Sequence, residues 1–99
     1  MVNEIQNTMI QQLGGMGKLK AMVGASQFSA LTKYELAFKF KGSGMTNCVK
    51  ITLNALDLYD IEFFRIRGSN IKPVASFLGV YAESLRGLFE ETTGLYLSL

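Results

Sequence analysis

The side chains that most often carry out chemistry in proteins are scarce in this chain. Among its 99 residues there is one cysteine and no histidine. Ser–His and Cys–His nucleophile pairs, imidazole-based proton transfer and the usual zinc sites are therefore excluded. Lys41 and Lys50 could lower the pKa of Cys48, but no histidine is present to carry the proton. We interpret Cys48 as incidental to function, and a single cysteine, which allows no internal disulfide, indicates a reducing, cytoplasmic setting.

The acidic residues form two groups. A hydrolytic pair or a hard-metal site requires carboxylates that converge on a cleft. Asp60 and Glu62 alternate along one predicted strand, so they share a sheet face opposite a threonine and a lysine of the neighbouring strand, as in ordinary surface pairing. Glu90 and Glu91 come late in a helix, where the macrodipole disfavours negative charge; a solvent-exposed face is expected there, and contact with a basic partner is the alternative. We therefore predict a protein that is not an enzyme and holds neither a metal ion nor a cofactor.

The basic residues remain as candidates for a binding surface. Five of the ten are predicted to project from one sheet face, joined at one side by Lys33 or Lys72, and with one acid these five form the candidate partner-binding set: Lys39, Lys41, Lys50, Glu62, Arg65 and Arg67. A basic sheet face with an exposed aromatic residue such as Phe64 can bind single-stranded nucleic acid, by neutralising phosphates and stacking bases. Glu35 and Asp60 share that face, however, and the net charge of the chain is only +2. Protein binding is the preferred interpretation of this face, and nucleic-acid binding is the alternative.

Alternating apolar and polar residues predict the strands that carry these side chains. Three such segments are separated by turn-forming residues and form an antiparallel meander, at residues 34–41, 48–54 and 58–67. The second turn places Ile51 opposite Ile61, and the first loop, at residues 42–47, places Lys39 opposite Lys50. One face then collects the apolar residues. A slip by one residue would turn all of them toward water, so the faces are strongly specified.

The flanking segments predict further strands. Residues 27–31 can form a fourth, short edge strand, and residues 71–75 a last one that Pro73 confines to a sheet edge. In the third strand of the meander the alternation breaks. Its two acids are at even-numbered positions and its two arginines at odd-numbered ones, so in a regular strand they would point to opposite faces of the sheet. A β-bulge near Phe63 and Phe64 is expected to bring all four charged side chains to the solvent face.

Helices are expected at both ends of the chain. Asn3 caps a first helix whose apolar residues recur at helical spacing and whose amides, Gln6 among them, face solvent. A short second helix is expected at residues 16–23, and Ser76 is expected to cap a closing helix at residues 77–93. The predicted fold class is therefore α+β: an N-terminal helix, a three- to four-stranded antiparallel meander, and a C-terminal helix packed on one sheet face in two layers. We expect a single domain that spans all 99 residues.

Several segments of the chain also resemble a known group of sequences. They are QQLGG at residues 11–15, MVGA at 22–25, ITL at 51–53, DLYDIEF at 57–63, GVYAE at 79–83 and FEETTGLY at 89–96. In that order they resemble small, functionally uncharacterised proteins of bacteriophages, prophages and other mobile elements. The resemblance implies a location in the cytoplasm of a host bacterium. It also implies a role that small phage proteins often have, which is to occupy the surface of a host protein, for instance as an inhibitor of a defence nuclease.

Three functions are consistent with the sequence. The preferred one is a non-catalytic, protein-binding module of a phage or mobile element, whose partner is a host protein. The second is a nucleic-acid-binding protein that uses the same sheet face. The third is a small self-assembling structural protein, a homo-oligomer joined through an apolar C-terminal tail made of Leu95, Tyr96, Leu97 and Leu99. The apolar runs are too short to cross a bilayer, so a membrane partner is not expected.

Overall fold

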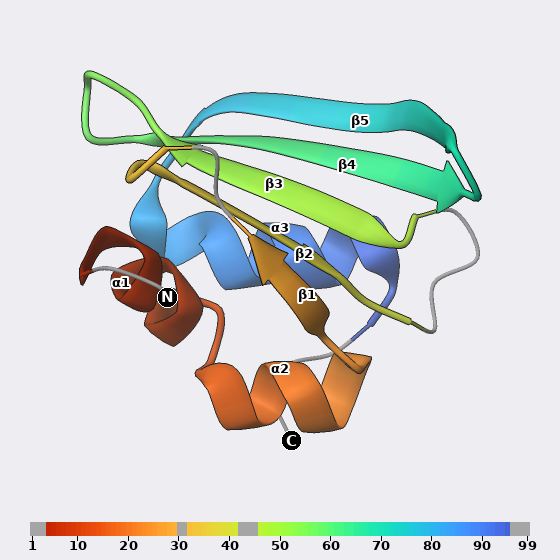
Figure 1. Ribbon diagram of the computed structural model, residues 1–99. Helices are drawn as coiled ribbons and strands as arrows, with labels where there is room; N and C mark the ends of the chain where they lie inside the picture. Colours follow the sequence, from red (N-terminus) through yellow and green to blue (C-terminus); the bar gives the residue numbers. More distant parts are fainter. Residues whose placement is uncertain (1–3, 30–31, 42–45, 96–99) are drawn as a thin grey trace.

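The computed structural model describes residues 4–29, 32–41 and 46–95 (Figure 1). The elements follow in the order α1 (Glu4–Gln12), α2 (Met16–Val23), β1 (Ser26–Ser29), β2 (Glu35–Lys39), β3 (Cys48–Leu53), β4 (Tyr59–Arg67), β5 (Asn70–Val80), the 3₁₀ helix η1 (Ala82–Ser84) and α3 (Leu85–Thr93). Within these residues the strands form one sheet in sequence order, and each strand pairs antiparallel with the next. The predicted α+β class and antiparallel meander are confirmed, but the sheet has five strands instead of three or four.

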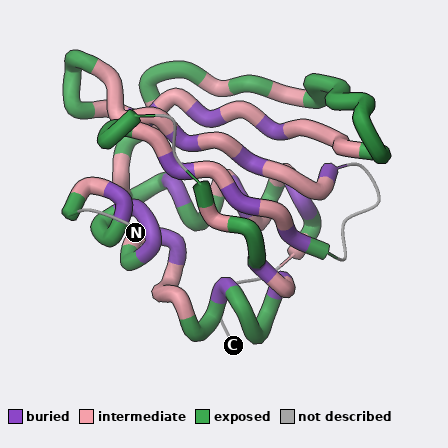
Figure 2. Tube along the Cα trace, viewed as in Figure 1, coloured by how far each residue is buried: buried purple, intermediate pink, exposed green. Residues whose placement is uncertain are grey.

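Helices α1, α2 and α3 lie on one side of the sheet, and none of them covers its other face (Figure 1). Along β2, β3 and β4, buried residues alternate with half-buried ones (Figure 2), as the apolar pattern predicted. The ring of Phe89 in α3 lies near three sheet aromatics, with centroids 6.2 Å from Phe38, 5.2 Å from Phe40 and 6.1 Å from Phe63. Burial of one such ring contributes about 1.5–3 kcal/mol, so this cluster is a principal link between α3 and the sheet.

The ends of several predicted elements fall differently from the prediction. The short helix expected at residues 16–23 is α2, and the edge strand expected at residues 27–31 is β1 at Ser26–Ser29. Residues 30 and 31, the predicted capping residue Asn3, and residues 96–99 of the apolar tail lie outside the described residues. Leu95, the first residue of that tail, is half-buried and packs against the core.

The pairing of β2 with β3 differs from the prediction by two residues. Ile51 pairs with Ile61 as predicted, but Lys39 lies opposite Cys48, and Lys50 lies opposite Ala37. The reason is Asn47, which was expected in the loop but pairs instead, its carbonyl accepting a 3.0 Å hydrogen bond from the amide of Phe40. A shift of two residues keeps every side chain on its face, so the predicted apolar face is the buried one.

The expected closing helix at residues 77–93, with Ser76 as its cap, is wrong at its beginning. Strand β5 continues to Val80, with Ser76 opposite Glu62 and Phe77 opposite Ile61. The ring of Phe77 packs edge-on against Phe63 at 6.2 Å. Pairing with β4 and this aromatic contact override the helical spacing of the apolar residues, and the α-helix starts only at Leu85.

The expected bulge lies opposite the predicted position, in the partner strand. Phe63 pairs with Ala75 and Phe64 with Pro73, so the extra residue is Val74 in β5, while β4 stays in regular pairing with β3. Because β4 itself does not bulge, Arg65 and Arg67 keep the parity of the buried Phe63 and do not join the acids on the open face. The prediction that all the charged side chains of β4 share one face is therefore wrong. Strand β5 is an edge strand, as Pro73 requires.

Candidate functional site

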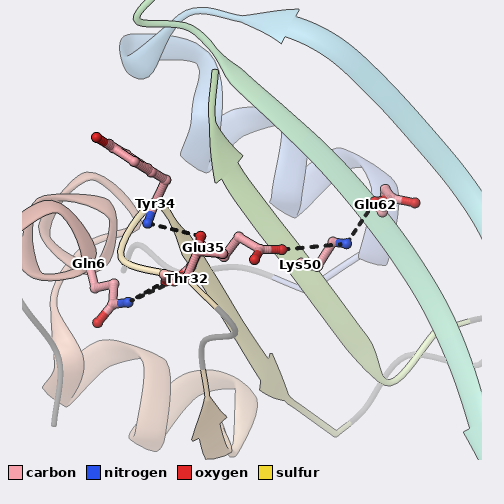
Figure 3. A network of polar contacts seen from close by, with 6 residues as sticks. All are labelled: Gln6, Thr32, Tyr34, Glu35, Lys50 and Glu62. Atoms are coloured by element: carbon pink, nitrogen blue, oxygen red, sulfur yellow. Dashed lines mark hydrogen bonds and ion pairs between the residues drawn. The ribbon is translucent and has the colours of Figure 1, made fainter. Parts of the chain in front are cut away.

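The open face of the sheet, opposite the helices, carries an ordered group of charges at its centre. Lys50 on β3 extends its Nζ between two carboxylates, 3.6 Å from Oε2 of Glu35 on β2 and 3.4 Å from Oε1 of Glu62 on β4 (Figure 3). The side chain of Glu35 is only 13% exposed, against 43% for that of Glu62. The Lys50–Glu62 pair was predicted, and the pairing shift adds Glu35. We call these three residues the central ion-pair group.

The charges of the open face do not add up to a basic surface. Strand parity places two cations there, Lys39 and Lys50, together with three acids, Glu35, Asp60 and Glu62, which leaves one net negative charge on the described strands. The basic sheet face expected from the sequence is therefore not found. A nucleic-acid interface that neutralises phosphates would require the opposite balance.

The position of Glu35 is fixed from the helix layer by Gln6. This side chain, 4% exposed, donates from Nε2 to the carbonyl of Glu35 at 2.9 Å and to that of Thr32 at 3.3 Å (Figure 3). Thr32 in turn accepts a hydrogen bond from the amide of Tyr34 through its Oγ1 at 3.2 Å. The expectation that Gln6 faces solvent is therefore wrong. A single amide on α1 holds the entry to β2, and so indirectly the central ion-pair group.

Asp60 has a structural role at the other end of the open face. Its Oδ1 accepts hydrogen bonds from Nδ2 of Asn54 and from the amide of Gly79, both at 3.1 Å. Gly79 lies in the second irregularity of β5, where one extra residue separates the partners of Tyr59 and Ile61, and its φ is +67°. The carboxylate thus satisfies an amide that the bulge removes from regular pairing. Asp60 stabilises the fold and does not converge with other acids on a cleft.

The open face is apolar toward the β4–β5 hairpin. Phe64 and Ile66 on β4 have the parity of Glu62, and their partners in β5 are Pro73 and Ile71. The side chains of Phe64 and Ile66 are half-buried, and Ile71 is 64% exposed. We call these four residues the apolar patch. It adjoins the central ion-pair group, so that charged and apolar surface lie side by side on one rigid sheet.

The arginines of the candidate set belong to a different surface, at the end of the β4–β5 hairpin. Arg65 pairs with Lys72 and Arg67 with Asn70, so the four side chains have the parity of the helix side of the sheet. They line a hollow of about 310 Å³. We call Arg65, Arg67 and Lys72 the basic hairpin cluster. Lys72 was expected at the side of the basic face but was left out of the candidate set, and Asn70 was missed; strand parity continued across the hairpin turn would have found both.

Lys41, the sixth residue of the candidate set, lies at neither surface. Its amide donates to the carbonyl of Val23 at 2.8 Å, which ties it to the end of α2. The candidate set thus divides into three places: Lys39, Lys50 and Glu62 on the open face, Arg65 and Arg67 in the basic hairpin cluster, and Lys41 beside α2.

Cys48 lies half-buried between the two strands that carry the candidate residues, opposite Lys39 on β2 and Phe64 on β4. Burial raises the pKa of its thiol, and the nearby charge of Lys39 lowers it by less. The thiol is therefore protonated at neutral pH, which does not suit a nucleophile. In the described part of the chain, no three acidic or cysteine side chains gather as they would around a metal ion.

Comparison of the chain with protein families, with characterised proteins and with solved structures finds no match. The helices of the described residues are all too short or too polar to span a bilayer. The functional argument therefore rests on the surfaces described above.

Proposed function

We propose that this chain is a non-catalytic protein-binding module of a phage or other mobile element. It acts in the cytoplasm of a host bacterium by occupying the surface of a host protein, and inhibition of a defence protein is the specific role we favour. The observation that carries the proposal is the open sheet face, on which the central ion-pair group adjoins the apolar patch without a covering helix.

This combination suits a protein partner. Protein interfaces combine an apolar, partly aromatic centre with polar groups around it. The apolar patch supplies the apolar centre, and Lys39 with the central ion-pair group supplies the polar groups. The charged side chains of the central ion-pair group are held by one another across neighbouring strands, so little side-chain entropy is lost when they bind. Exposed apolar side chains continue along the edge of the sheet at Leu78, 79% exposed, and Tyr81, 62% exposed.

The same face gives less support to nucleic acid. One net negative charge on its strands repels phosphate, whereas backbone binding requires a continuous row of cations. Phe64 is the open-face aromatic that could stack on a base, but it lies between Cys48 and Pro73, with no basic side chain opposite it on either strand. Protein binding is therefore the better match to the geometry.

A pull-down with a surface variant tests the proposal. The tagged chain is incubated with a lysate of the host bacterium, with and without nuclease, and retained proteins are identified by mass spectrometry. The Thr52→Arg variant adds bulk and charge to the open face. It is expected to fold because Thr52 lies between Glu35 and Asp60. The matched control is Gln11→Arg, which adds the same charge on the exposed side of α1.

We expect one host protein to be retained after nuclease treatment by the wild type and by Gln11→Arg. Its affinity for Thr52→Arg should be lower by about tenfold or more, which corresponds to about 1.4 kcal/mol, because the bulk of the arginine side chain keeps the partner away from the open face. Equal capture by Thr52→Arg would contradict the proposal. Loss of all binding on nuclease treatment would favour the nucleic-acid alternative, and recovery of the chain alone would favour self-assembly.

A further inference from the structure

We propose that the basic hairpin cluster binds an extended acidic segment of the partner protein, in which the acids occupy alternate positions. The proposal rests on the function proposed above and adds a second contact to it, on the other side of the sheet. The ligand class is a peptide with Asp or Glu at positions i and i+2, and the binding groups are Arg65, Arg67 and Lys72, with Asn70 as a neutral donor and acceptor.

The geometry of the hairpin sets this spacing. Arg65 and Arg67 are two residues apart on β4, so they are separated by about 6.8 Å along the strand, and Lys72 lies across from Arg65 at about 5 Å. An extended peptide repeats its side chains on one face at the same interval of about 6.8 Å. Two successive acids of such a peptide therefore come opposite two successive arginines. The guanidinium of Arg67 can bind one carboxylate in a bidentate manner, and Arg65, which keeps another contact in the fold, binds the next one together with Lys72.

Lys72 of this cluster lies where its charge destabilises the fold. Like charges directly opposite one another on paired strands are destabilising, and Arg65 and Lys72 form such a pair. No acid lines the hollow, and Arg67 and Lys72 form no ion pair with any residue that the structure describes. The central ion-pair group shows that the same sheet does compensate cations elsewhere. An unfavourable local arrangement of this kind is typical of a functional site.

The lining of the hollow favours an acidic peptide over nucleic acid. Its side chains are Arg65, Arg67, Asn70 and Lys72, so it contains no aromatic ring on which a base could stack. The cations also end with the hairpin, and the open face beyond it is negative overall. A compact group of carboxylates matches this short cluster better than a long row of phosphates does.

Fluorescence anisotropy with defined probes tests the inference. The first probe is a labelled peptide in which glutamate alternates with serine; the second has the same composition with its glutamates consecutive; the third is a short oligothymidylate. The test variant is Arg67→Gln, Lys72→Gln, which removes two cations and a like-charge contact, so it is expected to fold. Arg65 is kept because it is half-buried and makes other contacts in the fold. The control variant is Lys18→Gln, Lys20→Gln on the exposed side of α2, which has the same net charge.

We expect the alternating peptide to bind the wild type and the control equally, and to bind more tightly than the consecutive one. The test variant should bind it about tenfold more weakly or worse, since two charge-assisted contacts are lost. Three results would overturn the inference: no binding of the alternating peptide to the wild type, equal binding to the test variant, or tighter binding of the oligothymidylate through the same two residues.

The same variant separates this inference from the function on which it rests. If Arg67→Gln, Lys72→Gln still captures the host protein as the wild type does, while Thr52→Arg does not, the acidic-segment site is wrong and the protein-binding function stands. If the wild type captures no host protein, the protein-binding function fails, whatever the peptide measurements show.

Discussion

The central ion-pair group and the basic hairpin cluster use the same kinds of side chain in opposite ways. Lys50 lies on a strand with a neighbour on each side, and each neighbour supplies a carboxylate. At the hairpin β4 and β5 extend beyond the paired residues of β3, and the residue opposite Arg65 is another cation, Lys72. The comparison shows that the centre of the sheet pairs its cation with two acids, whereas at the hairpin Arg67 and Lys72 form no ion pair with the residues that the structure describes. We therefore assign structural and binding duties to the first region, and binding alone to the second.

The largest expected effect comes from detaching the hairpin. The side chain of Asn47 donates to the carbonyl of Ile66 at 2.8 Å and accepts from its amide at 2.7 Å, so it extends β3 by one residue beside β4. Asn47→Ala removes both hydrogen bonds and should lower the free energy of unfolding by about 2 kcal/mol. Urea denaturation followed by circular dichroism measures this. Asn7→Ala, at an exposed position of α1, is the control; an equal loss in both variants would contradict the role of Asn47.

A smaller loss is expected at the centre of the open face. Lys50→Met leaves two carboxylates without their cation, one of them on the mostly buried side chain of Glu35. The free energy of unfolding should fall by about 1 kcal/mol, because the pairs are partly exposed and screened by water. Adding Glu35→Gln should restore part of the loss, and thermal denaturation of the single and double variants tests this. If the double variant is less stable than Lys50→Met, the coupling within the group is wrong.

At the hairpin, replacing a lysine should raise the free energy of unfolding instead of lowering it. Lys72→Glu replaces a like-charge contact with an opposite-charge one across from Arg65, and should raise the free energy of unfolding by about 0.5 kcal/mol while it abolishes binding of the alternating acidic peptide. The stability of the Lys72→Gln variant should lie between that of the wild type and that of Lys72→Glu. The differences should shrink in high salt, where exposed charges are screened. A loss of stability in Lys72→Glu at low salt would show that Lys72 does not destabilise the fold, and would contradict the contrast between the central ion-pair group and the basic hairpin cluster.

The smallest effect concerns Cys48, which lies between the two regions. Because burial raises the pKa of this thiol, a smaller fraction is ionised at a given pH than for a free cysteine. Its alkylation by iodoacetamide should therefore be slower, and the midpoint of its pH–rate profile should lie above that of a cysteine-containing peptide. Lys39→Gln should raise the midpoint further, since the charge of Lys39 lowers this pKa. A midpoint at or below that of the peptide would contradict the assignment.

The sequence was sufficient for the centre of the fold and insufficient for its ends. Alternation predicted the meander and its buried face, because period-two burial is a strong signal wherever one face is apolar. It missed the second half of β5, residues 76–80, because the helix indicated by the spacing of Tyr81, Leu85 and Leu88 was extended back to Phe77, where pairing with β4 holds the chain in a strand instead. Gln6 was assigned to solvent because an amide gives no local sign that it will reach a distant carbonyl.

The candidate site was predicted only in part for a related reason. Lys50 and Glu62 were paired correctly because the β3–β4 turn is short and fixes their register. The arginines were placed on the wrong face because a break in alternation was taken for a bulge in their own strand. The extra residue lies in β5, where only the partner strand reveals it. Lys72 was then left out of the candidate set, since it becomes part of the site only once it lies opposite Arg65.

The two irregularities of β5 have a consequence for how copies of this chain behave at high concentration. A long, flat edge strand is a template for edge-to-edge association, and β5 is an edge strand 11 residues long. Pro73 offers no amide, Val74 interrupts the regular pairing beside it, and Gly79 turns the backbone away at its positive φ. No long regular stretch is left for a second chain to extend. The edge is thereby protected against fibrous aggregation, while the side chains of the hairpin and of the open face stay accessible.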